Sequence, residues 1–193
     1  MEHQNKFFEF IEMTHNLRKV ERMCHYTNTD RLENDMEHGY QLTLLCRLVM
    51  DYLKLPLDKN KVLKYALAHD IIEVYAGDTN PFDPSAVMDK EKRELASLKQ
   101  LKTQFPGTDM RDYIDQYHQK SDDEAKFVYA LDKFIPEYNI HLTDGKTFKQ
   151  FNIDRDTLAR HIRKAYIYPP LQPFADDFIE RIYQHDEWFN TIT

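Results

Sequence analysis

The chain has 193 residues, of which 41% are hydrophobic and 31% are charged, and its formal net charge is -7. This is the composition of a folded globular protein, and the length suits one domain with a sizeable core. The acidic balance argues against a broad phosphate-backbone interface, so we expect no nucleic-acid partner. A small anionic substrate is still compatible with it, because such a substrate needs only local positive charge.

The N-terminal stretch MEHQNKFFEFIEM is acidic and has no long apolar core. It therefore predicts neither a signal peptide nor a membrane anchor. The two cysteines, Cys24 and Cys46, lack C-x-x-C spacing and favour neither a disulfide framework nor a thiolate zinc site. We expect a cytoplasmic protein with reduced thiols and no membrane partner.

The sequence predicts an all-α architecture, because it has only four glycines and little strict alternation of apolar and polar residues. In chain order the predicted helices cover residues 3–24, 36–54, 59–76, 86–105, 109–119, 122–142, 154–166 and 173–189. The first helix has Phe7, Phe10, Ile11, Leu17 and Val20 available for one apolar side. Pro56 ends the second helix, and Gly77 is the predicted stop of the third. No linker is long enough to separate two domains, so residues 1–193 are expected to form one.

The stretch LAHDIIEVYAGDT, residues 67–79, places His69, Asp70 and Glu73 among apolar residues, and Asp78 follows just beyond them. A buried charge is costly unless it is paired or bound to a metal ion. On a helix, Glu73 shares the side of His69 and Asp70, because it lies four and three residues further along. These side chains therefore either face solvent together or hold a ligand.

Two other predicted helices offer partners in apolar surroundings. His38 opens the second helix, and Asp132 lies in the middle of the segment AKFVYALDKFIPEY. With His69 and Asp70 they form a His-His-Asp-Asp set from three helices. Because adjacent helical residues point about 100° apart, His69 and Asp70 reach one ion only if it lies over the ridge between them.

The order of these residues resembles a known family. The segments RLENDMEHGYQLTLL (31–45), LAHDIIEVYAGDT (67–79) and SDDEAKFVYALDKF (121–134) are together similar to the HD-domain metal-dependent phosphohydrolases, and more narrowly to the bacterial 5'-deoxynucleotidases. The resemblance covers about residues 15–142. It implies the HD-domain helical bundle, with residues 143–193 as additional C-terminal helices.

Membership implies four ligands for one divalent metal ion: His38, His69, Asp70 and Asp132. It also implies that Glu73 is a catalytic acid or base and that Asp78 is a further catalytic or substrate-orienting carboxylate. Mixed imidazole and carboxylate ligands suit Mn²⁺, Co²⁺, Fe²⁺ or Zn²⁺ better than Mg²⁺.

The residues expected to contact the substrate come before His38 and after Asp78 in the chain. Arg22 lies where the family usually places a phosphate-binding arginine, and a planar guanidinium suits phosphate. The family often follows that arginine with an aromatic residue, whereas Met23 follows it here. The loop after Asp78 is expected to form part of the substrate wall, with Thr79 and Asn80 near the sugar, although ordinary turn chemistry explains both residues equally well.

The resemblance implies a hydrolase that removes phosphate from nucleoside 5'-monophosphates, with the deoxy form preferred. One alternative is a (deoxy)nucleoside triphosphate triphosphohydrolase that releases polyphosphate, which needs room and extra cations for two more phosphates. The other alternative is a non-catalytic HD-fold binding protein, and the presence of both Glu73 and Asp78 argues against it. The family often forms dimers, so a homodimer is also expected.

Overall fold

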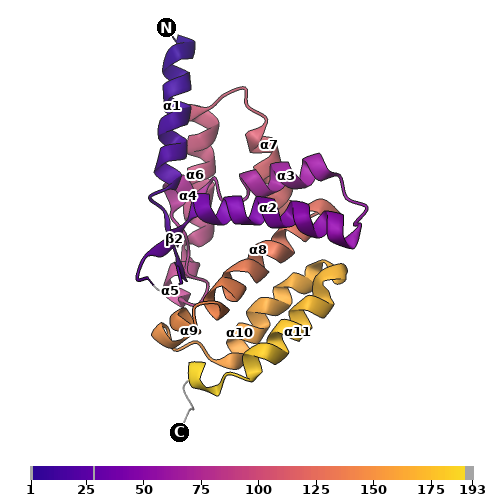
Figure 1. The fold of residues 1–193 in the computed structure, drawn as a ribbon. Coiled ribbons are helices and arrows are strands. Elements are labelled where there is room, and N and C mark those ends of the chain that lie inside the picture. The colour runs from indigo at the N-terminus through magenta and orange to yellow at the C-terminus, as the bar shows by residue number, and fades with distance from the viewer. Residues whose placement is uncertain (1, 28, 190–193) are drawn as a thin grey trace.

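The structure is a computed structural model that describes residues 2–27 and 29–189, and Figure 1 shows a bundle of helices with one small β-hairpin. The helices are α1 (Glu2–Leu17), α2 (Asp35–Leu53), α3 (Lys59–Ala68), α4 (Glu73–Ala76), α5 (Pro84–Met88), α6 (Lys90–Gln104), α7 (Met110–Gln119), α8 (Asp123–His141), α9 (Lys146–Gln150), α10 (Arg155–Ile162) and α11 (Gln172–Tyr183). The strands β1 (Glu21–His25) and β2 (Leu32–Asn34) pair antiparallel, and 3-10 turns form η1 (Arg163–Ile167), η2 (Pro169–Leu171) and η3 (Asp186–Trp188). The predicted all-α class is confirmed, with the hairpin as an addition.

The predicted helix over residues 3–24 is wrong in its last part. α1 ends at Leu17, and residues 21–25 form β1. A strand of five residues is too short for its alternation to stand out from a preceding helical pattern. The expected apolar side is also wrong in part, because Phe7, Phe10 and Ile11 are exposed.

The predicted helix over residues 59–76 is divided in two. α3 ends at Ala68, residues 69–72 form a turn, and α4 begins at Glu73. The Glu73 N–H donates to the Asp70 carbonyl at 2.8 Å, an i to i+3 bond that tightens this segment as in a 3-10 helix. Gly77 ends α4 with a φ of 73°, as predicted.

The other predicted helices agree with the structure to within a few residues, with three differences. The segment 86–105 is two helices, α5 and α6. The predicted helices over residues 154–166 and 173–189 each end in a 3-10 turn. The helix α9 was not predicted from the sequence. Five residues are too few to show a helical period. Across the described parts of the chain, no helix combines the length and apolarity needed to cross a membrane.

α8 lies at the centre of the bundle (Figure 1). α2 and α3 pack on one side of it, and α10 and η1 pack on the other, with α11 against them. Phe127, Val128 and Ala130 of α8 are fully buried between these layers. A smaller apolar cluster, which includes Met13 and Leu17, joins α1 to the α4 and α6 region.

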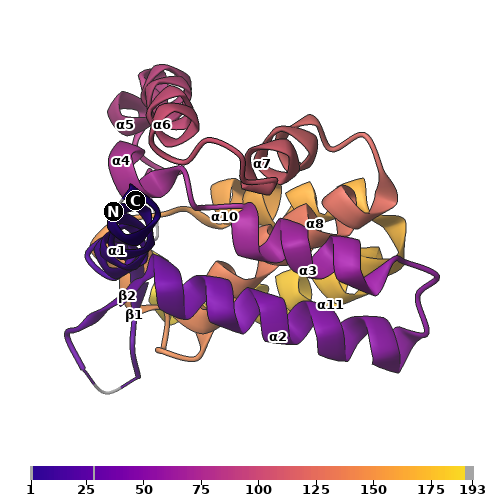
Figure 2. The ribbon, with the colours of Figure 1, turned by 90° about the horizontal axis from the view of Figure 1, so that it is seen from above.

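The hairpin lies at one end of α2 (Figure 2) and packs against α8. Asn34, the last residue of β2, caps α2: its side chain accepts from the Glu37 N–H, and the Glu37 carboxylate accepts from the Asn34 N–H. Arg31 pairs with Glu37 at 2.9 Å and so braces this start. The first turn of α2, the end of α3 and the middle of α8 therefore meet beside the hairpin.

Candidate metal centre and adjoining cavity

Four side chains from three parts of the chain converge where these helices meet. The ligand atoms of His38, His69, Asp70 and Asp132 all lie within 4.8 Å of one another. His38 Nε2 is 3.2 Å from Asp132 Oδ1, and His69 Nε2 is 2.8 Å from Asp70 Oδ2. The four residues that the sequence singled out thus form one cluster, and three of them are buried.

The hydrogen bond of His69 decides which ring nitrogen faces the cluster. Nδ1 lies 2.7 Å from the Ala66 carbonyl, which can only accept, so Nδ1 carries a proton. Nε2 faces Asp70 and has no hydrogen-bond partner. Burial alone would lower the pKa of His69, but Asp70 and Asp132 raise it, so the cluster favours positive charge at Nε2. A divalent metal ion fits this donor set.

The two carboxylates of the cluster are held in their charged form. Burial opposes this, but His69 and Arg22 keep the pKa of Asp70 well below its usual range. Burial likewise opposes ionisation of Asp132, whose pKa is lowered chiefly by Lys133. Lys133 Nζ lies 2.7 Å from Asp132 Oδ2, so this lysine pairs with a cluster residue rather than facing solvent. Ionised carboxylates are the form that binds metal ions.

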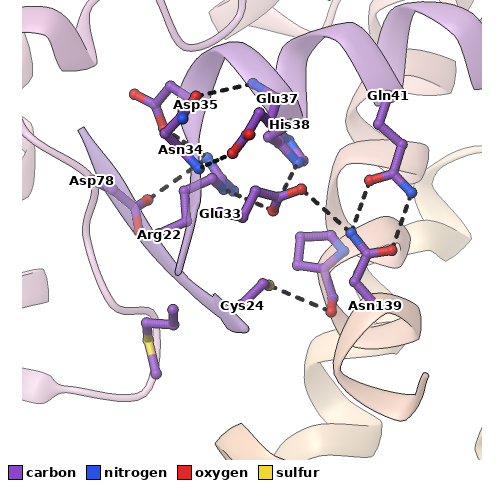
Figure 3. Close-up of polar contacts among 12 residues, drawn as sticks. Arg22, Cys24, Glu33, Asn34, Asp35, Glu37, His38, Gln41, Asp78 and Asn139 are labelled. Atoms are coloured by element: carbon purple, nitrogen blue, oxygen red, sulfur yellow. Dashed lines mark hydrogen bonds and ion pairs between the residues drawn. The ribbon is translucent and has the colours of Figure 1, made fainter. Parts of the chain in front are cut away.

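Arg22 projects from β1 into a group of acids (Figure 3). Its Nη1 lies 2.8 Å from Asp70, 3.4 Å from Asp35, 3.8 Å from Asp78 and 3.9 Å from Glu73. The side chain is only 11% exposed. Asp35, Asp70 and Glu73 by themselves form a group that could hold a cation. The Arg22 guanidinium supplies positive charge at that place.

The two predicted catalytic carboxylates flank this guanidinium and line the same cavity. Glu73 begins α4 and is buried, and its Oε2 has no hydrogen-bond partner. Burial raises the pKa of Glu73 well above its usual value, and the charges of Asp70 and Asp78 raise it further. Asp78 follows Gly77 in the loop after α4. The site therefore holds Glu73, whose carboxyl group binds a proton strongly, next to the carboxyl group of Asp78.

Two buried acids of the site, Glu33 and Asp35, were missed by sequence reasoning. Glu33 Oε2 lies 4.0 Å from His38 Nδ1, so its carboxylate faces the nitrogen of His38 that points away from Asp132. Burial raises the pKa of both Glu33 and Asp35 to about 7. The sequence held one signal for Asp35: it precedes His38 by about one helical turn and therefore shares the side of α2 on which His38 lies.

A cavity of about 390 Å³ adjoins the cluster. Arg22, Met23, Thr79 and Phe82 belong to its wall. Thr79 Oγ1 accepts a hydrogen bond from Arg93 at 2.9 Å, which holds the loop after Asp78 in place. This volume is within the usual range for small-molecule sites.

Asn80 does not belong to the wall of this cavity. Its Oδ1 accepts from the Phe82 N–H at 2.8 Å, which is an Asx turn. The geometry therefore favours turn chemistry for Asn80, and a sugar contact by this residue stays a prediction without structural support.

The helical bundle thus gathers two histidines and two aspartates beside an arginine of the hairpin. Residues 14–168 match the family model described as HD domain, so the chain belongs to the HD-domain family. The match extends beyond residue 142, where the sequence resemblance was expected to end, and includes α10 and η1.

Curated relatives carry related names. The chain is 31% identical over 130 residues to 5'-deoxynucleotidase HDDC2 of Homo sapiens, covering 65% of this chain and 62% of that protein. It is 27% identical over 161 residues to 5'-deoxynucleotidase YGK1 of Saccharomyces cerevisiae, covering 77% of this chain and 73% of that protein. The matched part thus spans 62% of the length of the human relative.

A solved structure supports the fold over nearly the whole chain. A predicted metal-dependent phosphohydrolase from Magnetospirillum magnetotacticum aligns with a TM-score of 0.82 and 24% identity, covering 97% of this chain and 96% of that one. The C-terminal helices that the sequence left unmatched therefore have counterparts in that fold.

Proposed function

We propose that this protein is a metal-dependent phosphohydrolase that removes phosphate from nucleoside 5'-monophosphates, with deoxyribonucleotides preferred. The observation that carries the proposal is the buried His-His-Asp-Asp cluster, which opens on a cavity that also holds Glu73 and Asp78. The names of the curated relatives support the substrate class.

The cofactor in this proposal is one divalent transition metal ion, Mn²⁺, Co²⁺, Fe²⁺ or Zn²⁺ rather than Mg²⁺. His38, His69, Asp70 and Asp132 would hold it. When bound, such an ion neutralises charge on a phosphoryl group and makes water more acidic.

The chain's own residues orient the substrate and move protons. Of the pair Glu73 and Asp78, one carboxylate takes the proton of the attacking water as the new P–O bond forms. The other gives a proton to the 5' oxygen of the nucleoside as the old P–O bond breaks. Arg22 keeps the neighbouring carboxylates in place and offers its remaining N–H groups to the phosphate. Thr79 in the cavity wall is assigned to the sugar.

The decisive experiment uses metal-stripped protein resupplied with Mn²⁺, Co²⁺, Fe²⁺, Zn²⁺ or Mg²⁺ and a panel of nucleoside mono- and triphosphates. Release of orthophosphate from deoxynucleoside monophosphates is the expected result. Release of tripolyphosphate from triphosphates would favour the triphosphohydrolase alternative. Tight metal binding without turnover of any substrate would favour the binding protein.

We also propose a homodimer formed through α2. Its residues Met36, Tyr40, Leu44, Leu48 and Tyr52 repeat every four positions and are exposed, Tyr40 by 73% and Tyr52 by 83%. Such a contiguous apolar stripe is unusual on a monomer surface. Arg47 and Asp51 on the same helix already pair with each other at 2.9 Å, so the proposal rests on the apolar stripe, which a twofold axis would pack against its own copy.

The proposed setting is the cytoplasm, with nucleotides as the substrate and no nucleic-acid partner. Cys24 and Cys46 are both buried and free, which fits a reducing compartment. Fluorescence microscopy of cells that express a fluorescent fusion, together with fractionation of the same cells, tests the location.

A further inference from the structure

Lysines from separate elements line the cavity beside the metal cluster. Lys90 begins α6, Lys120 caps the end of α7, and Lys164 lies in η1. We call these three residues the lysine cluster. They lie 30 and 44 positions apart in a chain of net charge -7, and only the tertiary packing, with α6 against α7 and with α7 and η1 against α8, places them on one cavity.

Two of the three ammonium groups have no acidic partner. Lys90 is 3.3 Å from Glu94, but no carboxylate of the described residues lies within 4.0 Å of Lys120 or Lys164. Lys120 donates to the His118 carbonyl at 3.1 Å, which leaves other N–H donors unused. Lys120 and Lys164 therefore bring positive charge to the cavity wall with no carboxylate in contact, although Glu94 belongs to the same wall.

Neighbouring cations act on both Lys120 and Lys164. Burial and the charge of Lys133 lower the pKa of both Lys120 and Lys164, and Lys90 contributes to each shift in the same direction. Like charges that are held together disfavour their charged forms. An anion bound between them would relieve this repulsion.

The position of Lys164 is set by buried groups. Its ammonium lies 3.2 Å from His161 Nδ1, which must accept because an ammonium only donates. The ring proton is then on Nε2, which lies 3.5 Å from the buried Glu137 Oε1. Burial lowers the pKa of His161 to about 3 and raises that of Glu137 to about 8. Burial thus favours the uncharged form of both His161 and Glu137, which weakens the charge that Glu137 offers to Lys164.

We infer that the lysine cluster is a second anion site, which binds a second phosphate group of the nucleotide while the first lies at the metal cluster. This inference rests on the proposed function, because it assumes that the scissile phosphate occupies the His-His-Asp-Asp end of the cavity. The second phosphate has two chemical sources: the β-phosphate of a polyphosphate chain, or a 3'-phosphate on the sugar.

The test compares the wild type with the double variant Lys120→Gln/Lys164→Gln. Substrates are a deoxynucleoside monophosphate, the matching triphosphate and the matching 3',5'-bisphosphate. We expect the ratio of kcat/KM for a doubly phosphorylated substrate to that for the monophosphate to fall about tenfold in the variant, mainly through KM, as loss of a charge-assisted hydrogen bond predicts. A fall with the triphosphate identifies a polyphosphate chain, and a fall with the bisphosphate identifies the 3'-phosphate. An unchanged ratio for both would overturn the inference.

A matched control and a binding assay separate this inference from the proposed function. Lys92→Gln removes an exposed lysine of α6 that is not part of the cavity wall, and it should leave the ratio unchanged. Calorimetry with inorganic pyrophosphate needs no turnover. The wild type and Lys92→Gln should bind pyrophosphate about tenfold more tightly than the double variant. Equal affinity in all three proteins would disprove the anion site, even if the hydrolase activity is established.

Discussion

Arg22 Nη1 lies 2.8 Å from Asp70 Oδ2, so one carboxylate serves both the metal cluster and an internal guanidinium. Asp70 therefore connects two sources of positive charge. The β-hairpin and the metal centre are coupled through this residue, because a substitution at Arg22 changes the electrostatic potential at Asp70 and so at the cluster.

Arg22→Ala should lower the free energy of unfolding by about 3–5 kcal/mol, because it leaves buried carboxylates without their counter-charge. Arg22→Lys should recover only part of this loss, because a single ammonium cannot match a planar fork of donors. Urea denaturation measured with and without metal checks both statements. The loss should be smaller with metal, because the ion replaces part of the missing charge. A variant as stable as the wild type would show that the acids need no internal cation.

His69→Ala and Asp70→Ala should each abolish tight metal binding and phosphohydrolase activity. Glu73→Gln should retain metal but lose at least about a hundredfold in kcat, which is the usual contribution of one acid or base. Metal at about 100 times its Kd should stabilise the wild type and Glu73→Gln by about 2.7 kcal/mol. Thermal unfolding in a metal titration measures this shift, and its presence in Asp70→Ala would contradict the ligand assignment.

Glu137 should make the protein less stable as the pH rises from about 6.5 to 8. Burial raises the pKa of its folded-state carboxyl to about 8, so the native state keeps a proton that the unfolded state has lost, and stability falls with pH until the folded pKa is passed. The slope is at most about 1.4 kcal/mol per pH unit. The charged or titratable groups near it are His161, Lys164, Lys133 and Cys24.

The measurement is urea denaturation of the wild type and Glu137→Gln at several pH values. The difference between the two proteins isolates Glu137, and it should become independent of pH below the ordinary pKa of a glutamate. His161 has the opposite sign, because its lowered folded pKa of about 3 makes stability rise with pH up to about 6.5. Parallel curves for both proteins above pH 6.5 would rule out a protonated Glu137.

Leu44→Glu/Leu48→Glu should convert the proposed homodimer to a monomer, because it places charges at the centre of the apolar stripe on α2. Both side chains are exposed, so the monomer should keep its fold and its melting temperature within a few degrees. Sedimentation at several concentrations distinguishes the two states. Leu67→Glu, an exposed apolar position on α3, is the control and should leave the dimer intact.

The sequence by itself determined the helical class and the four cluster residues. Helical periodicity is local, and the histidines and aspartates lie in segments whose order and spacing are visible without a fold. The stop at Gly77 was likewise readable from the sequence, because a helix cap depends on residues close in the chain. The cap at Asn34 was not predicted, since the second helix was expected to begin at residue 36.

Only the tertiary structure decided how distant residues meet. Arg22 faces Asp70 because a short hairpin, which the helical pattern concealed, turns its side chain towards the end of α3. Glu137 and Lys164 share His161 as a partner because α10 and η1 pack on α8. Such contacts leave no periodic signal, since they depend on the packing of whole helices rather than on the spacing of neighbours.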